Sequence, residues 1–257
     1  MEVSGKVVVV TGAGSGIGAG LASRFSREGA AAVVVADIDL DAATRVAEGI
    51  DGQAMRVDVA DDDSNRRLIE DVEAAFGPID LFCANAGIAF EGNEQSPDDD
   101  WDRIWGINFK SHVFAARHLI PLWLGRGGGY LLVTASAAGL LSNIGAAQYT
   151  VTKHAAVAFA EWLSITYGER GVKVSCLCPQ GVRTPMMEHA GKIAELLAAT
   201  ALSPEEVAAA VVAGLESERF LILPHPEVAD FMLRKATDRD GWIAAMQRLQ
   251  SRLGLSK

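Results

Sequence analysis

Tyr149 and Lys153 are the side chains in this sequence whose types and spacing best suit acid–base chemistry. The run from 146 to 169 reads as a helix, and residues four apart lie on one face of a helix. A phenol has an ordinary pKa of about 10, and a neighbouring ammonium group favours its ionised form. The pair could therefore give or take a proton at an oxygen atom. On spacing alone, a solvated surface pair is the alternative.

A glycine-rich turn lies near the start of the chain. A short β-branched run at 6–10 leads to Thr11, and glycines stand at 12, 14, 16 and 18 before helix-like sequence from 17 to 28. Where a strand meets a helix, backbone N–H groups and the helix dipole favour a phosphate, and glycine lets it approach closely. This order of strand, glycine turn and helix indicates a dinucleotide-binding site.

Asp37 closes a second apolar run, at 31–36, and stands 19 residues beyond Gly18. This is about the spacing of an acid that binds a ribose 2′-hydroxyl group. A carboxylate there repels a 2′-phosphate, and no arginine or lysine lies in the glycine turn or directly after Asp37 to offset the repulsion. We therefore expect NAD as the cofactor rather than NADP. A role for Asp37 as a plain turn or cap residue is the alternative.

The rest of the chain alternates between strand-like and helix-like sequence. Apolar runs that read as strands lie at 6–10, 31–36, 54–57, 79–84, 130–134, 172–178 and 220–223. Strands that are apolar on both faces and alternate with helices predict an α/β fold, with a doubly wound, seven-stranded parallel sheet covered by helices on both faces. We expect residues 1–223 to form one dinucleotide-binding and catalytic domain. Residues 224–257 read as a helical extension, packed on that domain or on a neighbouring subunit.

Composition excludes several classes of function. The chain has 257 residues, 49% of them hydrophobic, and a net charge of −10, which argues against nucleic acid as a partner. It has no apolar run long enough to span a membrane and no secretory signal, so we expect a cytoplasmic protein without membrane contact. The three cysteines sit in apolar runs and read as buried thiols, and the five histidines show no metal-ligand spacing.

Taken together, these motifs resemble those of the short-chain dehydrogenase/reductase family, over roughly residues 6–223. The matching positions are the T-G-x-x-x-G-x-G turn at 11–18, Asp58 with Val59, the segment Asn85-Ala86-Gly87, Asn108, Ser136 and the Y-x-x-x-K pair at 149 and 153. Ser136 stands 13 residues before Tyr149, which is the family's usual spacing. The resemblance implies a Rossmann-like fold and an oxidoreductase that acts on CH–OH groups.

The resemblance also implies roles for four catalytic residues. Tyr149 would take the proton of a substrate alcohol, and Ser136 would hydrogen-bond the substrate oxygen. Lys153 would lower the tyrosine pKa and hold the nicotinamide ribose, and Asn108 would connect Lys153 to solvent through water. A cap residue is the alternative for Ser136, and a satisfied buried amide is the alternative for Asn108.

Cofactor contacts follow from the same resemblance. The residues implied are Gly12, Gly14, Ser15, Gly16, Ile17, Gly18, Asp37, Ile38, Asp58, Val59, Asn85, Ala86, Gly87, Tyr149, Lys153, Pro179, Gly181, Val182 and Thr184. Val182 and Thr184 match positions that bind the nicotinamide carboxamide. One position departs from the family pattern, because Gln180 stands where a glycine is usual after Pro179. The local backbone path is therefore an open question.

The resemblance places a substrate pocket beside these residues. Its expected lining is apolar and contains no arginine or lysine: Ile88, Ala138, Leu140, Leu141, Ile144, Met186 and Met187. We infer a hydrophobic secondary alcohol or ketone, cyclic or steroid-like. The alternative is that several of these residues are core or face another subunit. Residues 186–201 read as a loop that closes over substrate, with His189 as a surface residue of that loop.

Small residues are frequent in the helical runs at 101–124 and 146–169. The resemblance implies that these helices pair across subunits in a homodimer or homotetramer. Three other functions remain open: a non-catalytic dinucleotide-binding sensor or scaffold, an NADP-dependent carbonyl reductase, and an epimerase or dehydratase that uses the same tyrosine and lysine. The complete set of four catalytic residues argues against the sensor.

Overall fold

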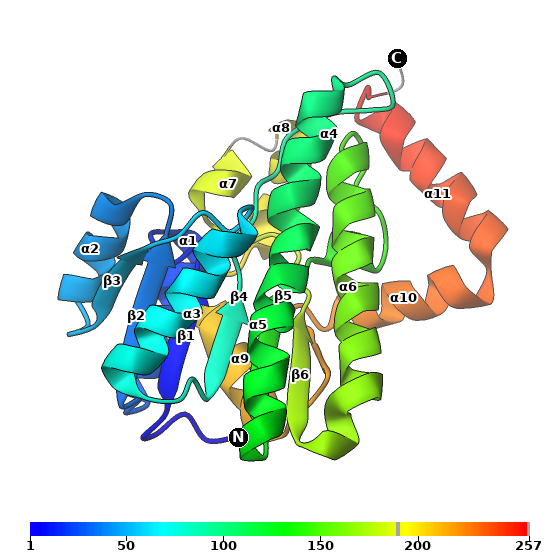
Figure 1. Ribbon diagram of the computed structural model, residues 1–257. Coiled ribbons are helices and arrows are strands. Elements are labelled where there is room, and N and C mark those ends of the chain that lie inside the picture. The colour runs from blue at the N-terminus through cyan, green and yellow to red at the C-terminus, as the bar shows by residue number, and fades with distance from the viewer. Residues whose placement is uncertain (189–190, 256–257) are drawn as a thin grey trace.

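The computed structural model describes residues 1–188 and 191–255, and these residues form a seven-stranded, entirely parallel sheet (Figure 1). The strands are β1 (Val7–Thr11), β2 (Ala32–Asp37), β3 (Gln53–Arg56), β4 (Leu81–Ala84), β5 (Gly129–Thr134), β6 (Val172–Leu177) and β7 (Leu221–Ile222). Their order across the sheet is β3-β2-β1-β4-β5-β6-β7. The predicted doubly wound α/β fold is confirmed.

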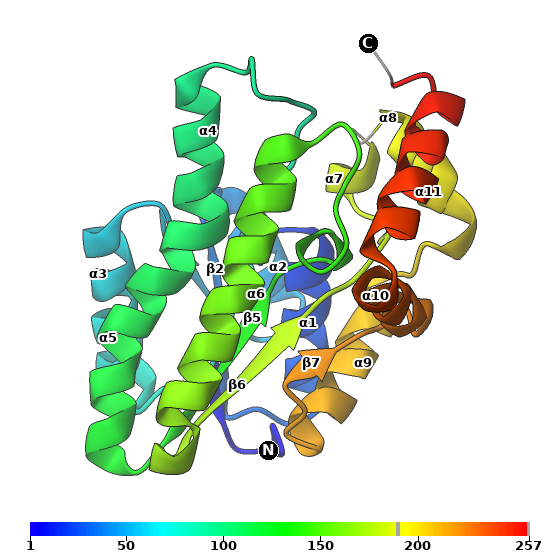
Figure 2. The ribbon, with the colours of Figure 1, turned by 90° about the vertical axis from the view of Figure 1, so that its right-hand side faces the viewer.

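Helices cover both faces of the sheet (Figures 1 and 2). One face packs against α3 (Asp62–Phe76), α5 (Ser111–Arg126) and α6 (Ala147–Tyr167), and the other against α1 (Gly16–Arg27), α2 (Leu40–Glu48) and α9 (Pro204–Glu216). Strand β1 shows why: Val7 and Val9 point into the first core, and Val8 and Val10 point into the second. Such a strand needs apolar residues at every position.

The predicted helix before β5 is interrupted. It consists of α4 (Asp98–Trp105), a π-helical turn η1 (Gly106–Lys110) and α5. The Ser111 N–H donates to the Gly106 carbonyl five residues earlier, so the turn holds one more residue than an α-helical turn. Asn108 lies within this turn, and no feature of the sequence indicated the interruption.

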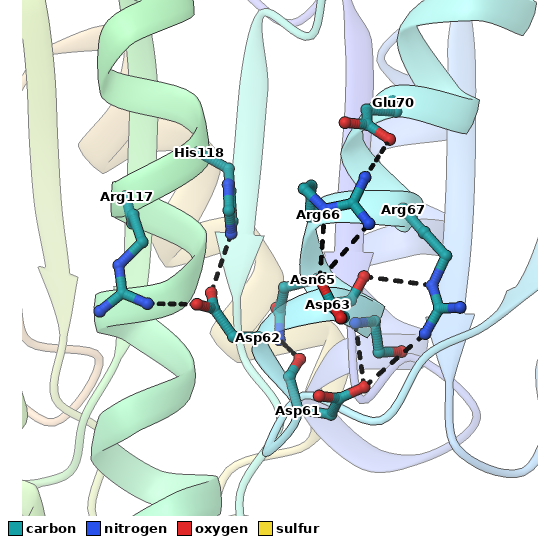
Figure 3. Close-up of polar contacts among 10 residues, drawn as sticks. Asp61, Asp62, Asp63, Asn65, Arg66, Arg67, Glu70, Arg117 and His118 are labelled. Carbon is teal, nitrogen blue, oxygen red and sulfur yellow. Dashed lines mark hydrogen bonds and ion pairs between the residues drawn. The ribbon is translucent and has the colours of Figure 1, made fainter.

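Helices α3 and α5 are joined at the surface by a small cluster of charged side chains (Figure 3). Asp62 of α3 binds Arg117 of α5 and accepts a hydrogen bond of 2.8 Å from His118 of α5 if that ring nitrogen carries the proton. Exposed ion pairs contribute about 0–1 kcal/mol, so this cluster adds little to the stability of the fold.

Beyond β7 the chain forms two further helices, α10 (Glu227–Thr237) and α11 (Arg239–Arg252), which lie outside the helix layers (Figure 2). Val228 of α10 is buried against Ala137 and Leu141, the residues that follow β5. At the far end of the tail, just after α11, the Leu253 carbonyl accepts a hydrogen bond of 2.6 Å from Lys192 of α8 (Gly191–Leu197). The tail thus contacts the segments on both sides of the expected site.

Two further observations bear on the sequence predictions. All three cysteines are buried and free, as predicted, and burial raises the pKa of the Cys83 thiol. Within residues 1–188 and 191–255, none of the helices is both long and apolar enough to cross a membrane.

Candidate functional site

A cavity of about 1580 Å³ opens at the carboxyl edge of the sheet. It is lined by the residues that follow β1, β2, β4, β5 and β6, by α7 (Pro185–Glu188) and α8, and by the tail helices. Ligands of open parallel sheets bind at this edge, where the strand order reverses. The reversal here lies between β1 and β4, because β1 pairs with β2 on one side and with β4 on the other.

The glycine turn after β1 packs against the segment after β4. A Cβ atom at Gly12 would lie 2.7 Å from the Ala86 Cα atom, and Gly12 has a φ of +64°, so only glycine fits there. The Asn85 side chain holds the turn by donating to the Thr11 carbonyl at 3.0 Å. Ser15 precedes α1 without capping it by its side chain, which leaves the first N–H groups of the helix for a ligand. This cradle fits the pyrophosphate of a dinucleotide.

Asp37 ends β2 at the rim of the same cavity. Its Oδ2 atom accepts a hydrogen bond from the Gly14 N–H at 2.8 Å, and its Oδ1 atom accepts one from the Asp39 N–H at 3.0 Å. These are the bonds of a turn residue, but a carboxylate has about four acceptor sites and each oxygen keeps one free. The carboxylate is therefore able to order the turn and bind a ribose hydroxyl at once.

Most of the expected cofactor residues line this one cavity. The exception is Gly14, whose N–H is taken by Asp37. Asp58 lies on the wall with its Oδ1 atom accepting from the Ala60 N–H at 3.0 Å, and Ile38 projects into solvent beside Asp37. The cavity also takes in Val57, Thr134 and Gln180, which the motifs did not indicate.

Ser136 and Tyr149 meet at the other end of the cavity. Ser136 follows β5 and caps the 3-10 turn η2 (Ala137–Gly139), since its Oγ atom accepts from the Ala138 N–H at 3.1 Å. The cap uses only a lone pair, so the serine keeps its own proton to donate. Tyr149, in the first turn of α6, is half-buried and hydrogen-bonds Ser136. The structure thus brings the expected pair together.

The electrostatics of Tyr149 differ from the sequence expectation. Burial raises the pKa of Tyr149, and the hydrogen bond with Ser136 lowers it by less. The Lys153 Nζ atom lies 5.7 Å from the centre of the tyrosine ring and donates to the Thr134 carbonyl at 3.0 Å. Desolvation of the phenol is the largest cause of the shift, and the Lys153 ammonium group is hydrogen-bonded elsewhere.

Lys153 carries a buried charge. Its side chain is 3% exposed, and this burial lowers its pKa to about 8. The Thr134 carbonyl at the end of β5 is the acceptor that holds the ammonium group in place. A lysine poised near neutral pH is able to exchange a proton with its surroundings.

Asn108 lies beneath the cavity and does not line it. Its side-chain amide accepts from the Ile88 N–H at 2.8 Å and donates to the Ile88 carbonyl at 2.9 Å. A longer bond of 3.4 Å runs to the Thr152 hydroxyl, on α6 next to Lys153. The side chain is therefore a satisfied buried amide that ties the segment after β4 to α6, and its expected part in a water relay stays a prediction.

The apolar end of the cavity contains six of the seven expected pocket residues: Ile88, Ala138, Leu141, Ile144, Met186 and Met187. Leu140 does not line it, which corrects that prediction. Leu140 packs against the tail instead, and the chain leaving η2 lines the cavity from Leu141 onward. Over the described part of 186–201 the chain is largely helical, in α7 and α8, where a loop was expected, and His189 lies outside the described residues.

The tail supplies a wall that the motifs did not reveal. Trp242, Met246 and Leu249 of α11 line the cavity, and their helical spacing was the one sequence signal for it. Arg234, Arg248 and Arg252 line it as well, in addition to the six expected residues at its apolar end. Arg248 and Arg252 are exposed and stand four residues apart, which places them on one face of α11.

Comparisons with known proteins agree with this geometry. The model of the short chain dehydrogenase family matches residues 6–194. The chain is 35% identical to 1-deoxy-11-beta-hydroxypentalenate dehydrogenase of Streptomyces exfoliatus, over 94% of this chain and 90% of that protein. It is 38% identical to meso-2,3-butanediol dehydrogenase of Serratia marcescens, over 85% and 90%. A short chain dehydrogenase/reductase from Burkholderia phymatum in complex with NAD superposes with a TM-score of 0.86 at 28% identity, over 93% of this chain and 96% of that one.

The buried charge of Lys153 predicts a specific pH dependence of stability. Its pKa falls from 10.5 in the unfolded chain to about 8 in the folded protein. Between these values the unfolded chain binds more protons, so Lys153 makes stability rise with pH. Relative to Lys153→Met, the wild-type free energy of unfolding should gain about 3 kcal/mol between pH 8 and pH 10.5.

Urea unfolding across this pH range measures the effect. Lys173→Met is the control, since the Lys173 ammonium group stays exposed at the surface on β6, where it pairs with Glu218 at 3.0 Å. A difference between wild type and Lys153→Met that is constant with pH would show that the Lys153 charge is not desolvated.

Proposed function

Because the chain belongs to the short-chain dehydrogenase/reductase family of oxidoreductases, we propose that it is an NAD-dependent dehydrogenase that transfers a hydride between the nicotinamide and a hydrophobic secondary alcohol or ketone. One observation carries the proposal. A single cavity holds the glycine turn and Asp37 at one end and Ser136, Tyr149 and Lys153 at the other. A dinucleotide bound along it would bring its reactive ring to the acid–base pair.

Each catalytic residue has a role in this proposal. Bound NAD supplies the hydride acceptor. Tyr149 takes the hydroxyl proton of the alcohol as the C–H bond breaks, and returns it when a ketone is reduced. Ser136 donates to the substrate oxygen and stabilises its developing charge. Lys153 places a positive charge near the phenol and binds the nicotinamide ribose, and Asn108 holds the segment after β4 against α6 and carries the proton relay to solvent.

The cavity supports a substrate with an apolar body. The relatives include enzymes named for a hydroxypentalenate and for 2,3-butanediol, so family membership alone does not select the size of the substrate. The apolar residues after β4, β5 and β6 favour a hydrophobic ring or chain, and the arginines of α11 would bind an acidic group at its far end. The alternatives are a non-catalytic NAD sensor and an NADP-dependent carbonyl reductase.

NAD is favoured over NADP by Asp37. The carboxylate lies at the cavity rim and is fixed by the Gly14 N–H, where a 2′-phosphate would meet it. We further propose that residues 224–257 form an extension that packs on the domain of residues 1–223, which the contacts of Val228 support. The cytoplasmic location stays a prediction.

The role of Tyr149 is tested by Tyr149→Phe. This variant should lose turnover by about 100-fold or more, because no other group at that position exchanges the proton, and should bind NADH nearly as the wild type does. NADH formation from NAD is followed by absorbance with a panel of cyclic, aromatic and steroidal secondary alcohols. Alcohols that carry a carboxylic acid are also supplied as their methyl esters. Turnover by the variant near the wild-type rate would refute the tyrosine mechanism, and NADH binding without turnover of any alcohol by the wild type would favour the sensor.

The cofactor preference is tested by Asp37→Ser. The wild type should bind NADH at least about tenfold more tightly than NADPH, and the substitution should narrow this gap because it removes the repulsion. Asp39→Ser is the control: Asp39 is an acid two residues away that caps α2, and serine preserves the cap. Titration calorimetry gives both affinities. Tighter binding of NADPH by the wild type would overturn the assignment to NAD.

A homodimer or homotetramer is supported by an exposed aromatic face. Trp105, Phe109, Phe159 and Trp162 form a chain of ring contacts of 4.7–6.2 Å across α4, η1 and α6. Trp162 is 53% exposed and Ile165 is 76% exposed beside them, and such patches favour association. Sedimentation should show a dimer or tetramer that Ile165→Glu weakens and that Leu233→Glu, on α10, does not. A wild type that stays monomeric would contradict this proposal.

A further inference from the structure

His225 is a buried histidine in the connection between β7 and α10, and only 2% of its surface is exposed. Its Nδ1 atom accepts a hydrogen bond of 3.1 Å from the backbone N–H of Gln180, 45 residues earlier. Because Nδ1 accepts, the ring is neutral and its proton is on Nε2. Within residues 1–188 and 191–255 the buried Nε2 atom has no partner. Burying a polar N–H group without a hydrogen-bond partner costs free energy, and an apolar side chain would fill this position without that cost. Packing alone therefore does not account for a histidine here.

The sheet brings the two residues together. Strands β6 and β7 are parallel, with Leu177 opposite Ile222, and the Cys178 N–H donates to the Ile222 carbonyl at 2.9 Å. Gln180 and His225 each follow within three residues of these strand ends. Prolines on both sides of His225 restrict its backbone, and the Val228 N–H donates to the His225 carbonyl at 3.2 Å.

The contact fixes one peptide group completely. The carbonyl of Pro179 and the N–H of Gln180 belong to the same peptide. The carbonyl accepts from the Ala137 N–H at 2.8 Å, and the N–H donates to His225. With both polar groups held, the peptide plane cannot rotate, and the direction in which the chain leaves it is set.

That chain is the segment expected to bind the nicotinamide. Its other end is held by Leu202, which donates to the Gly181 carbonyl at 3.0 Å and accepts from the Arg183 N–H at 2.8 Å. Gln180 itself has a negative φ, since Asp51, Ser142 and Glu218 are the non-glycine residues with positive φ in the described ranges. The missing glycine therefore costs no backbone strain, and His225 occupies the N–H that begins the segment.

We propose that His225 is a positioning residue for the bound nicotinamide, which it controls by holding the Pro179–Gln180 peptide and thereby the segment from Gly181 to Thr184. This inference rests on the proposed function as a dinucleotide-dependent enzyme. It assigns a role to the tail: His225 lies 31 residues beyond residue 194, where the match to the family model ends. A residue outside the matched region thus shapes the cofactor site.

The test compares two ligands, NADH and ADP-ribose, which lacks only the nicotinamide. In His225→Leu the Kd for NADH should rise about 3- to 10-fold, the loss expected for one hydrogen bond, while the Kd for ADP-ribose stays as in the wild type. His225→Asn should restore the wild-type ratio of the Kd for NADH to the Kd for ADP-ribose, because the asparagine side-chain oxygen takes the place of Nδ1 as the acceptor. Val228→Ala is the control: it removes packing from the same segment, so it should lower the melting temperature and leave the ratio unchanged.

Each possible result of this test either supports the inference or overturns it. An unchanged ratio of the two Kd values in His225→Leu, an equal loss for both ligands, or an asparagine variant no better than leucine would overturn the inference. If His225→Leu does not fold, His225→Gln carries the test, because its polar atoms fall near Nε2 and miss Gln180. A wild type that binds NADPH instead is tested with 2′-phospho-ADP-ribose as the truncated ligand. A wild type that binds neither dinucleotide would remove the proposed function itself.

Discussion

The close packing of the turn after β5 against α6 is the constraint on which the catalytic end of the cavity depends. Gly139 ends the 3-10 turn that Ser136 caps, and a Cβ atom there would overlap the carbonyl oxygen of Lys153. The absence of a side chain lets the turn rest directly on the helix. Backbone contact therefore sets the relative positions of Ser136, Tyr149 and Lys153, independently of their side-chain rotamers. Precision of this kind suits a site in which hydrogen-bond geometry decides the chemistry.

The same packing explains why desolvation dominates the electrostatics. It removes water from both the phenol and the ammonium group, which raises the pKa of Tyr149 and lowers that of Lys153 to about 8. Both shifts favour the neutral forms, so the protein alone prepares Tyr149 as a proton donor, the form needed to reduce a ketone. Oxidation of an alcohol needs the phenolate, and its formation requires positive charge beside the phenol. Lys153 supplies one such charge, because it is mostly protonated below its pKa of about 8, and bound NAD would add another in the proposed mechanism.

Patterns that act over a few residues predicted much of this molecule. The strands are continuous apolar runs because both faces of each are buried. The glycine turn and Asp37 were predicted from their positions at the ends of β1 and β2. Features that depend on long-range packing escaped. Sequence spacing did not indicate the π-helical turn around Asn108, the packing of Leu140 against the tail, the net shift of the Tyr149 pKa or the arginines on the cavity wall. A spacing rule reports which residues share a face, but it does not report how much water they lose.

The tail shows how such long-range contacts assemble a site. Lys235 of α10 donates to the carbonyls of Leu140 and Leu141 at 2.7 and 2.6 Å, and burial lowers its pKa. His225 holds the peptide after Pro179, and the Ala137 N–H holds the other side of that peptide. One helix and the loop before it therefore brace both the segment that carries Ser136 and the segment proposed to bind the nicotinamide. A change in the tail would therefore move both segments, and with them the alignment of the substrate oxygen and the proposed cofactor.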